Sequence, residues 1–485
     1  MNAQIRRMTV LVVLMFLALL AGVTWIQYAK AAELKARPDN TRSYYQSFDH
    51  DRGPIIVASG QVIASSTEVD DDYGYQRQYA NGPLYAPVTG YFTVLPSSTG
   101  IEWAENQVLE GTADSLFWSR IQDLVTGKEP MGGAVELTID PVAQQAAWDA
   151  LGDQKGSVVV LDAKTGEILV LVSKPSYDPN LLAAHSRDDI LSAYEQMEQD
   201  PDNPLYNRAI AGNLYFPGST FKLITAAAAL ESGNYTADSE LEAPAELDLP
   251  NSDHKLTNFG DSSCSSTGTM TMAQALTVSC NTAFGQLGMD LGQDALNAQA
   301  EKFGFGQDLA VPLTVTPSQF PQGMSIANTA MAAIGQYEVK VTPLQMAMVA
   351  SAIVNDGRLM EPHLVRTERD ANLSVIATTS ANELGRPISA ETASTLHDMM
   401  VAVAVNGTAQ RAAVDGVTVG AKTGTAQKDA DHAPDVWTVG FAESGGRSLA
   451  IAVVVEDGGS AGAGGTGGTV AAPIVSTVLK AVLNR

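Results

Sequence analysis

The most constraining feature of this sequence is a long apolar run near its N-terminus. Residues 8–26 are apolar except for Thr9, Gly22 and Thr24. A helix rises about 1.5 Å per residue, so the run would be about 28 Å long, close to the roughly 30 Å of a bilayer's hydrocarbon core. We therefore predict a membrane anchor that leaves the rest of the chain outside the cytoplasm.

The residues around the run leave two interpretations open. Arg6 and Arg7 precede it, and Trp25 and Tyr28 stand where an aromatic belt would lie. A cleavable signal peptide is the alternative, because residues 29–31 (Ala-Lys-Ala) match a small-x-small cleavage site. The apolar part of a signal peptide is usually about 7–15 residues long, so the length favours a retained single-pass anchor with a cytoplasmic N-terminus.

The composition excludes several classes of function. Lysine and arginine number 29 against 54 aspartate and glutamate residues, which gives a net charge of −25. Such an acidic surface repels phosphate backbones, so nucleic acid is not an expected partner. Two cysteines cannot build a cysteine-based zinc site, and the six histidines form no His-x-x-x-His pair. We expect neither a metal nor a cofactor.

The order of predicted elements indicates an α+β protein. Short β-like runs separated by turns occupy the first part of the external region. A hairpin at residues 158–173, helical stretches that include residues 271–291, and three strands within residues 417–456 then predict one large domain with a mainly antiparallel sheet. We divide the chain into a cytoplasmic tail (1–7), a transmembrane signal-anchor helix (8–28), a linker (29–41), a small, mostly β, non-catalytic pedestal domain (42–133) and a catalytic domain (134–485).

A candidate nucleophile stands at the start of an apolar helix. Ser219-Thr220-Phe221-Lys222 follows directly after a Pro-Gly pair. Residues three apart share a helix face, so the Lys222 amine can reach the Ser219 hydroxyl. An ordinary lysine has a pKa near 10.4 and is protonated at neutral pH, but burial and a second cation would lower that pKa. The motif alone is weak, because an N-cap serine followed by a surface lysine has the same letters.

Two further motifs follow in order along the chain. Ser279-Cys280-Asn281 offers a hydroxyl and an amide, and residues 422–425 (Lys-Thr-Gly-Thr) offer a cation and two hydroxyls on a strand. Residues 163–166 repeat the letters Ala-Lys-Thr-Gly of residues 421–424, but they lie in a predicted hairpin turn before the nucleophile. We interpret that earlier copy as structural.

This set of motifs resembles the signature of penicillin-binding proteins and class A β-lactamases. The stretches 51–55, 82–91, 207–209 and 215–222 look like a class B penicillin-binding protein. Residues 82–91 resemble the actinobacterial penicillin-binding protein A group in particular. The resemblance covers nearly the whole chain. It implies a penicillin-binding, serine-transpeptidase domain with a mainly antiparallel five-stranded sheet packed by helices.

The resemblance also implies an activity. Such enzymes are D,D-transpeptidases that cross-link peptidoglycan stem peptides ending in D-Ala-D-Ala through a serine acyl-enzyme, in cell-wall synthesis during growth or division. Carried over residue by residue, catalysis falls to Ser219, Lys222, Ser279 and Lys422, and substrate binding to Asn281, Thr423, Gly424 and Thr425. The expected partners are lipid-linked peptidoglycan precursor polymer, β-lactams as inhibitors, and a polytopic membrane glycosyltransferase, because residues 42–133 are too few to form one.

The middle residue of the second motif raises a separate question. Cys280 and Cys264 are the two cysteines of the chain. Outside the cytoplasm they can form a disulfide, which would close a loop of about 15 residues and contribute about 3 kcal/mol in the chain-entropy model. Two buried thiols are the equal alternative.

Other functions fit the same resemblance. A non-catalytic scaffold or sensor for penicillin or muropeptides would not need the intact Ser219, Lys222 and Lys422, and a sensor would require several membrane spans. A β-lactamase would be smaller and would need a deacylating carboxylate, which the sequence does not identify. A D,D-carboxypeptidase activity can coexist with cross-linking, since water can replace the acceptor amine.

Overall fold

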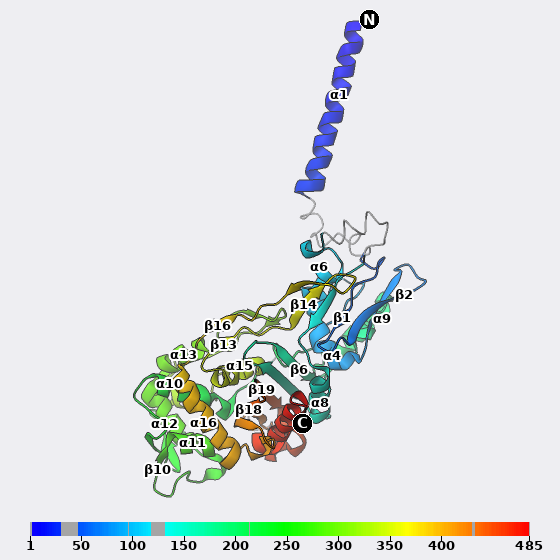
Figure 1. The fold of residues 1–485 in the computed structure, drawn as a ribbon. Helices are drawn as coiled ribbons and strands as arrows, with labels where there is room; N and C mark the ends of the chain where they lie inside the picture. Colours follow the sequence, from blue (N-terminus) through cyan, green and yellow to red (C-terminus); the bar gives the residue numbers. More distant parts are fainter. Residues whose placement is uncertain are drawn as a thin grey trace.

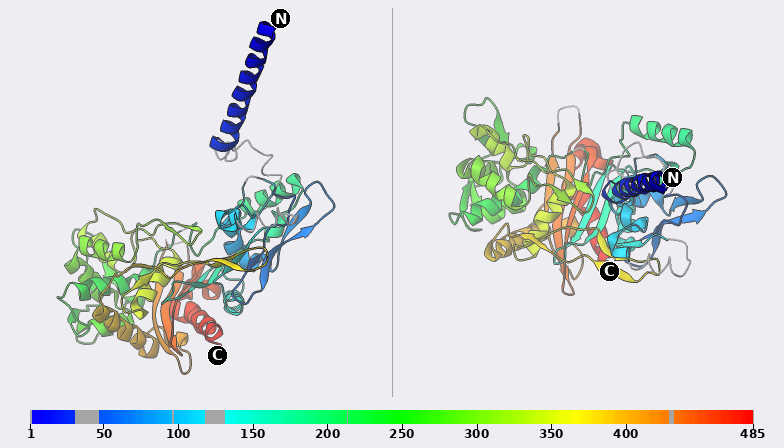
Figure 2. Two further views of the ribbon diagram at one scale, coloured as in Figure 1. Left: turned by 45° about the horizontal axis from the view of Figure 1, so that its top comes forward. Right: turned by 90° about the horizontal axis from the view of Figure 1, so that it is seen from above.

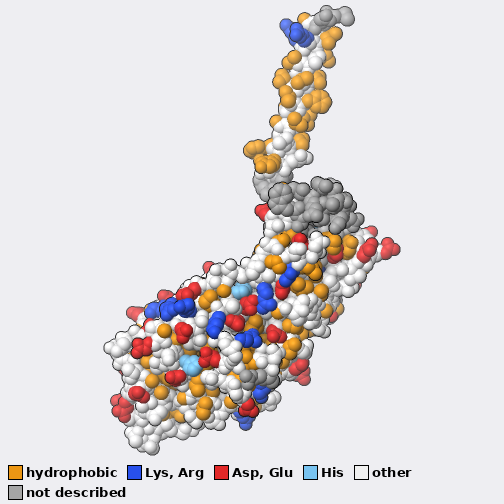
Figure 3. Space-filling model, viewed as in Figure 1, with side chains coloured by type: hydrophobic (Ala, Val, Ile, Leu, Met, Phe, Trp, Pro, Cys, Tyr) orange, Lys and Arg blue, Asp and Glu red, His pale blue; other side chains and the backbone are white. Residues whose placement is uncertain are grey.

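A computed structural model describes residues 2–30, 47–95, 97–117, 131–212, 214–428 and 432–484. Helix α1 (Asn2–Thr24) continues through the π-helical turn η1 (Trp25–Ala29) and stands apart from the globular part (Figure 1). It is apolar and none of it is buried. Among the described residues, it is the one helix that is long and apolar enough to cross a membrane. Hydrophobic side chains line it, with basic ones at its N-terminal end (Figure 3). This is compatible with the predicted single-pass anchor. Most of the predicted linker, residues 29–41, lies outside the described residues.

The part of the globule next to the anchor contains a six-stranded sheet. Its strand order is β15-β14-β4-β1-β2-β3. Strands β1 and β4 pair in parallel, and the other neighbouring strands of the sheet pair antiparallel. Three strands come from the predicted pedestal region and three from the chain beyond residue 133, so this N-terminal unit is not made of residues 42–133 alone. The bounds are β1 (Ile55–Ile56), β2 (Val62–Glu68), β3 (Tyr75–Tyr79), β4 (Ala134–Leu137), β14 (Val365–Arg369) and β15 (Val375–Thr378), with helices α4 (Gly82–Thr89), α5 (Gly100–Ala104) and α6 (Asn106–Leu109).

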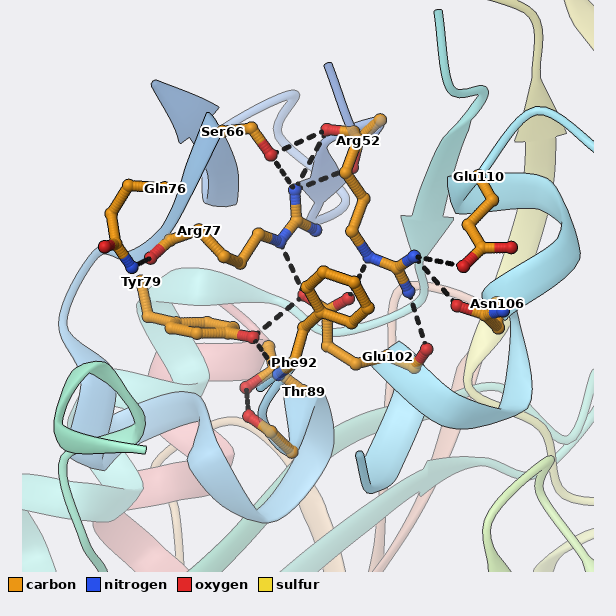
Figure 4. Close-up of polar contacts among 12 residues, drawn as sticks. Arg52, Ser66, Gln76, Arg77, Tyr79, Thr89, Phe92, Glu102, Asn106 and Glu110 are labelled. Carbon is orange, nitrogen blue, oxygen red and sulfur yellow. Dashed lines mark hydrogen bonds and ion pairs between the residues drawn. The ribbon is translucent and has the colours of Figure 1, made fainter. Parts of the chain in front are cut away.

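A buried ion cluster ties this N-terminal unit together (Figure 4). The carboxylate of Glu102 on α5 is fully buried and accepts hydrogen bonds of 2.7 Å from both Arg52 Nε and Arg77 Nε. Burial alone would raise the pKa of Glu102, but the two guanidinium groups outweigh it and the pKa is lowered. The Arg52 guanidinium also lies 4.1 Å from the centre of the Phe92 ring. The cluster therefore links α5 with β3 and with the segment before β1.

The larger part of the molecule is built on a five-stranded sheet, in which all neighbours are antiparallel. The order β17-β18-β19-β5-β6 places the last three strands of the chain beside the early hairpin. The predicted α+β class and the five-stranded antiparallel sheet are thus confirmed. The strands are β5 (Gly156–Asp162), β6 (Ile168–Lys174), β17 (Thr418–Ala426), β18 (Asp435–Ser444) and β19 (Arg447–Val455).

Helices cover both faces of this sheet (Figure 2). Helices α8 (Pro141–Leu151) and α17 (Ala472–Val482) pack together on one face, and α15 (Pro343–Val354), which is buried along its whole length, packs on the other. Beyond α15 lies a helical lobe (green and yellow in Figure 1). Its helices are α10 (Lys222–Glu231), α11 (Met272–Val278), α12 (Asn281–Leu291), α13 (Gln293–Lys302), α14 (Ile326–Ala333) and α16 (Ala390–Asn406).

The remaining elements are short ribbons and one surface helix. The surface helix is α9 (Arg187–Gln199), which lies beside the N-terminal unit (Figure 1). The two-stranded ribbons pair β7 (Glu240–Glu242) with β10 (Thr269–Thr271), β8 (Glu246–Asp248) with β9 (Lys255–Thr257), β11 (Leu309–Ala310) with β12 (Thr314–Val315), and β13 (Leu359–Met360) with β16 (Glu383–Gly385).

Candidate active site

The predicted nucleophile lies on a tight turn held against the edge of the large sheet. The 3₁₀ turn η4 (Gly218–Phe221) leads into α10, and Gly218 has a φ of +53°. The Gly218 amide donates a 2.9 Å hydrogen bond to the Gly335 carbonyl, and a Cβ at Gly218 would lie 3.1 Å from the Thr425 carbonyl oxygen. The positive φ and the close approach to Thr425 both favour glycine at residue 218. They place the partly exposed Ser219 beside the end of edge strand β17.

The predicted base is fully buried and points toward the second motif. Lys222 Nζ donates to the carbonyl oxygen of Ser279 at 2.8 Å, to Asn281 Oδ1 at 2.8 Å and to Ser279 Oγ at 3.3 Å. Burial, and after it the nearby Lys422, hold the pKa of Lys222 well below its ordinary value. Among the described residues, the Ser219 hydroxyl has no hydrogen-bond partner. No hydrogen bond in the described residues joins Lys222 Nζ to this hydroxyl, since the amine points to Ser279 and Asn281. The lowered pKa of Lys222 favours the neutral amine that nucleophile activation needs.

A second buried amine contacts the Ser279 hydroxyl. Lys422 on β17 is fully buried, and its Nζ donates to Ser279 Oγ over 2.8 Å and to the Thr423 carbonyl over 2.9 Å. Burial lowers the pKa of Lys422 to about 7. Ser279 therefore lies between two amines, and its hydroxyl can pass a proton between them.

The backbone at Ser279 explains how this hydroxyl reaches both lysines. Ser279 has φ 61° and ψ 42°, a left-handed conformation, and it ends α11, after which α12 begins at Asn281. The sequence predicted one helical stretch over residues 271–291, and the structure has two helices separated by this break. Non-glycine residues seldom adopt this conformation, and such residues cluster at functional sites.

Strand β17 carries the third motif. A Cβ at Gly424 would lie 2.8 Å from the Pro217 carbonyl oxygen, so the glycine lets turn η4 pack directly on the strand. Thr423 is buried, and its hydroxyl is hydrogen-bonded to that of Thr408. Thr425 is partly exposed at the end nearest the nucleophile turn. The structure thus brings all three predicted motifs to one place.

The earlier copy of the third motif lies elsewhere. Residues 163–166 form the turn between β5 and β6, and Lys164 is exposed and donates to the Gly446 carbonyl at 2.9 Å. This matches its interpretation as a structural turn.

Family comparisons agree with this arrangement. The model described as the penicillin binding protein transpeptidase domain matches residues 156–480. This match spans more than half of the chain. The chain belongs to the penicillin-binding protein transpeptidase family. A second model, the penicillin binding protein A dimerisation domain, matches residues 52–135.

Penicillin-binding proteins of mycobacteria are similar to the whole chain. The peptidoglycan D,D-transpeptidase PbpA of Mycolicibacterium smegmatis is 42% identical over 494 aligned residues, which cover 100% of both chains. PbpA of Mycobacterium tuberculosis is 40% identical over 492 aligned residues, which cover 100% of this chain and 99% of that protein. The ceftriaxone acyl-enzyme structure of penicillin-binding protein A from M. tuberculosis has a TM-score of 0.87 at 40% identity and covers 90% of this chain and 100% of that chain. These relatives confirm the resemblance to class B enzymes of the penicillin-binding protein A group.

One residue of this penicillin-binding protein site could not be found from the sequence. The buried Asn258 accepts, through its Oδ1, hydrogen bonds from the backbone amides of Asn281 at 2.9 Å and Thr282 at 3.1 Å. The Asn281 side chain in turn donates to the Thr257 carbonyl at 3.0 Å. These contacts fix the start of α12 and the orientation of the Asn281 amide. A single asparagine outside any motif gives no signal of such a role.

The two cysteines lie beside the same segment. Cys264 and Cys280 form a disulfide with a Cα–Cα distance of 5.8 Å. Since Cys280 stands between Ser279 and Asn281, the bridge attaches the second motif to the loop that carries Cys264. In the described part of the chain, no group of three or more histidine, cysteine or acidic side chains is arranged to hold a metal ion.

Proposed function

We propose that the protein is a membrane-anchored peptidoglycan D,D-transpeptidase that forms its acyl-enzyme on Ser219. The observation that carries the proposal is the hydrogen-bonded arrangement of Lys222, Ser279 and Lys422 beside strand β17, on which the turn that carries Ser219 packs. The family membership supports it, as do the acyl-enzyme complexes of penicillin-binding protein A from M. tuberculosis with ceftriaxone and penicillin G.

In the acylation step, the Ser219 oxygen attacks the penultimate D-Ala carbonyl of the donor stem. The hydroxyl proton goes to the neutral Lys222 amine, and a serine ester forms as the bond to the terminal D-Ala breaks. Ser279 donates its proton to the leaving amine and is reprotonated by one of the two lysines. The amine of an acceptor stem then attacks the ester, which forms the cross-link and frees Ser219.

We assign substrate binding to Asn281 and to residues 423–425 of β17. Asn281 would hold the donor peptide through its amide, while Thr423 and Thr425 would bind the terminal carboxylate and Gly424 would allow a close approach. The backbone amides of Ser219 and Thr425 would stabilise the tetrahedral oxyanion. The lowered pKa values of both lysines support this scheme, because they favour the neutral form that a base must have.

We propose that residues 1–7 are cytoplasmic and that the region from residue 42 onward is extracytoplasmic. The Cys264–Cys280 disulfide supports this location, because such bonds persist in oxidising compartments. The family matches at residues 52–135 and 156–480 support the division into a pedestal (42–133) and a transpeptidase domain (134–485). A polytopic glycosyltransferase would supply the polymer that this protein cross-links.

An exchange assay tests this function. The full-length protein in detergent is incubated with a stem pentapeptide ending in D-Ala-D-Ala and a labelled D-amino acid as the acceptor amine. We expect a product in which the label replaces the terminal D-Ala, and none with Ser219→Ala. Hydrolysis without exchange would favour a D,D-carboxypeptidase, and the absence of both reactions in a folded sample would favour a scaffold or sensor.

A further inference from the structure

A cavity of about 430 Å³ lies at the junction of the N-terminal unit and the transpeptidase domain. Helices α4 and α5 and the loop between them form one wall, and residues 204–211 form much of the other. This volume lies within the roughly 300–1,000 Å³ typical of ligand pockets, which often occur between domains. None of the residues assigned to catalysis or substrate binding lines this cavity.

Five aromatic side chains form part of its wall. Three of them are exposed: Trp103 on α5 at 67%, Tyr206 at 42% and Tyr194 at 38%. Large aromatic rings left in water cost free energy, and ring faces that gather at a cavity are available to stack against a ligand. The five aromatic residues of the wall are Tyr91, Trp103, Tyr177, Tyr194 and Tyr206.

The rest of the wall is uncharged and mostly apolar, with polar side chains at Ser98, Thr99, Asn207 and Thr314. None of its described residues is a lysine, arginine, aspartate or glutamate, although the chain has a net charge of −25. Ser98 Oγ is buried in this wall and has no hydrogen-bond partner in the described part of the chain. An unpaired buried hydroxyl is unfavourable, so a ligand hydroxyl or amide that reached Ser98 would be bound favourably.

We propose that this cavity binds an uncharged saccharide, a sugar unit of the glycan strand whose stem peptides the active site cross-links. The inference rests on the proposed function and names a second part of the same substrate. The C–H bonds on one face of a pyranose ring carry a slight positive charge and suit the negative face of an aromatic ring. The stem peptide carries carboxylates and an amine, and burying these in a wall without countercharges would be unfavourable.

The wall also connects to the nucleophile turn. Asn207 donates to the Pro87 carbonyl at 2.7 Å, which joins the two sides of the cavity. The next residue, Arg208, and Tyr215 both donate to Glu456 Oε1, at 2.8 and 2.7 Å. Tyr215 stands four positions before Ser219. A sugar bound here would therefore contact the chain segment that leads to Ser219.

Isothermal titration with chitotetraose, an uncharged polymer of N-acetylglucosamine, tests this proposal. The full-length protein is kept in a zwitterionic detergent, because a detergent with a sugar headgroup would compete. We expect saturable binding. Trp103→Ala should raise the Kd about tenfold, which corresponds to about 1.4 kcal/mol. Ser98→Ala should raise it severalfold. Phe259→Ala removes a ring that is 77% exposed and lies outside the cavity, and it should leave the Kd unchanged.

Three outcomes would overturn the proposal: no binding at millimolar chitotetraose, equal effects of Trp103→Ala and Phe259→Ala, or displacement of the sugar by a charged stem peptide. Acylation of Ser219 by benzylpenicillin is measured in the same preparation. Acylation without sugar binding would overturn this inference alone. Sugar binding without acylation would support the saccharide site and contradict the proposed function.

Discussion

Lys422 Nζ lies 2.8 Å from Ser279 Oγ, although the two residues are 143 positions apart in the chain. The edge strand β17 brings the lysine to the break between α11 and α12, where a left-handed backbone turns the serine toward it. The same hydroxyl lies 3.3 Å from Lys222 Nζ. Two buried amines therefore share one hydroxyl, and the predictions below test what each contributes.

Replacing Lys422 should alter both the rate and the pH dependence of acylation. Lys422→Met removes the amine while keeping an unbranched side chain, and the acylation rate with benzylpenicillin should fall about 100-fold. In the proposed mechanism acylation requires the neutral form of Lys222, so its rate should rise with pH through the pKa of Lys222. Lys422 helps to lower that pKa. Its removal should raise the pKa and move this rise to higher pH.

Lys164→Met is the matched control for that measurement. It changes the lysine of the other Ala-Lys-Thr-Gly copy, which lies in the β5–β6 turn. Stopped-flow acylation over a pH series should show the Lys164→Met profile unchanged. A Lys422→Met profile that rises at the same pH as wild type, or at a lower one, would contradict the assigned coupling.

The close packing of η4 on β17 predicts a steric effect at Gly424. The methyl group of Gly424→Ala would lie 2.8 Å from the Pro217 carbonyl oxygen, so the turn that carries Ser219 must shift. Because a misplacement of about 1 Å can cost about 100-fold in rate, we expect acylation to fall at least tenfold. Gly385→Ala is the control, since its added methyl meets no atom within 4 Å. Equal acylation rates for the two variants would refute this packing argument.

Asn258 should act as a positioning residue. Asn258→Ala leaves the amides of Asn281 and Thr282 without their acceptor, which should lower the free energy of unfolding by about 1–3 kcal/mol. The Asn281 side chain would also lose its fixed orientation, so acylation at a temperature well below Tm should slow about tenfold. The exposed Asn372→Ala serves as the control. A purely structural role would lower Tm and leave the low-temperature acylation rate unchanged.

Reduction of the disulfide should destabilise the second motif. Cys264 and Cys280 are 16 positions apart, and breaking their bond should lower the free energy of unfolding by about 3 kcal/mol in the chain-entropy model. Denaturant unfolding with and without dithiothreitol measures the difference. The double variant Cys264→Ser, Cys280→Ser should have the free energy of unfolding of the reduced protein, with or without dithiothreitol. If reductant leaves wild-type unfolding unchanged, the bridge does not contribute to stability.

The sequence predicts those features that depend on local pattern. The hairpin of β5 and β6 and the strands β17 to β19 follow from runs of β-branched residues, and their antiparallel sheet follows from the order of elements. The three motifs identify the residues that meet at the site. The motifs could not predict that the Lys222 amine donates hydrogen bonds to Ser279 and Asn281, because these contacts depend on how separate elements pack.

Other features are set by contacts between distant segments. Strands β14 and β15 complete the N-terminal sheet from more than 200 positions downstream, and no local pattern indicates that pairing. The left-handed turn at Ser279 interrupts a sequence that is helical by composition on both sides. Asn258 acquires its role only when its loop meets the start of α12.

Mass spectrometry after incubation with benzylpenicillin shows whether Ser219 forms an acyl-enzyme. Full-length protein in detergent is compared with Ser219→Ala after proteolytic digestion. We expect a stable adduct on the peptide that contains Ser219, and no adduct on any peptide of the variant. An adduct of equal yield in Ser219→Ala, or no adduct in well-folded wild-type protein, would contradict the proposed acyl-enzyme on Ser219.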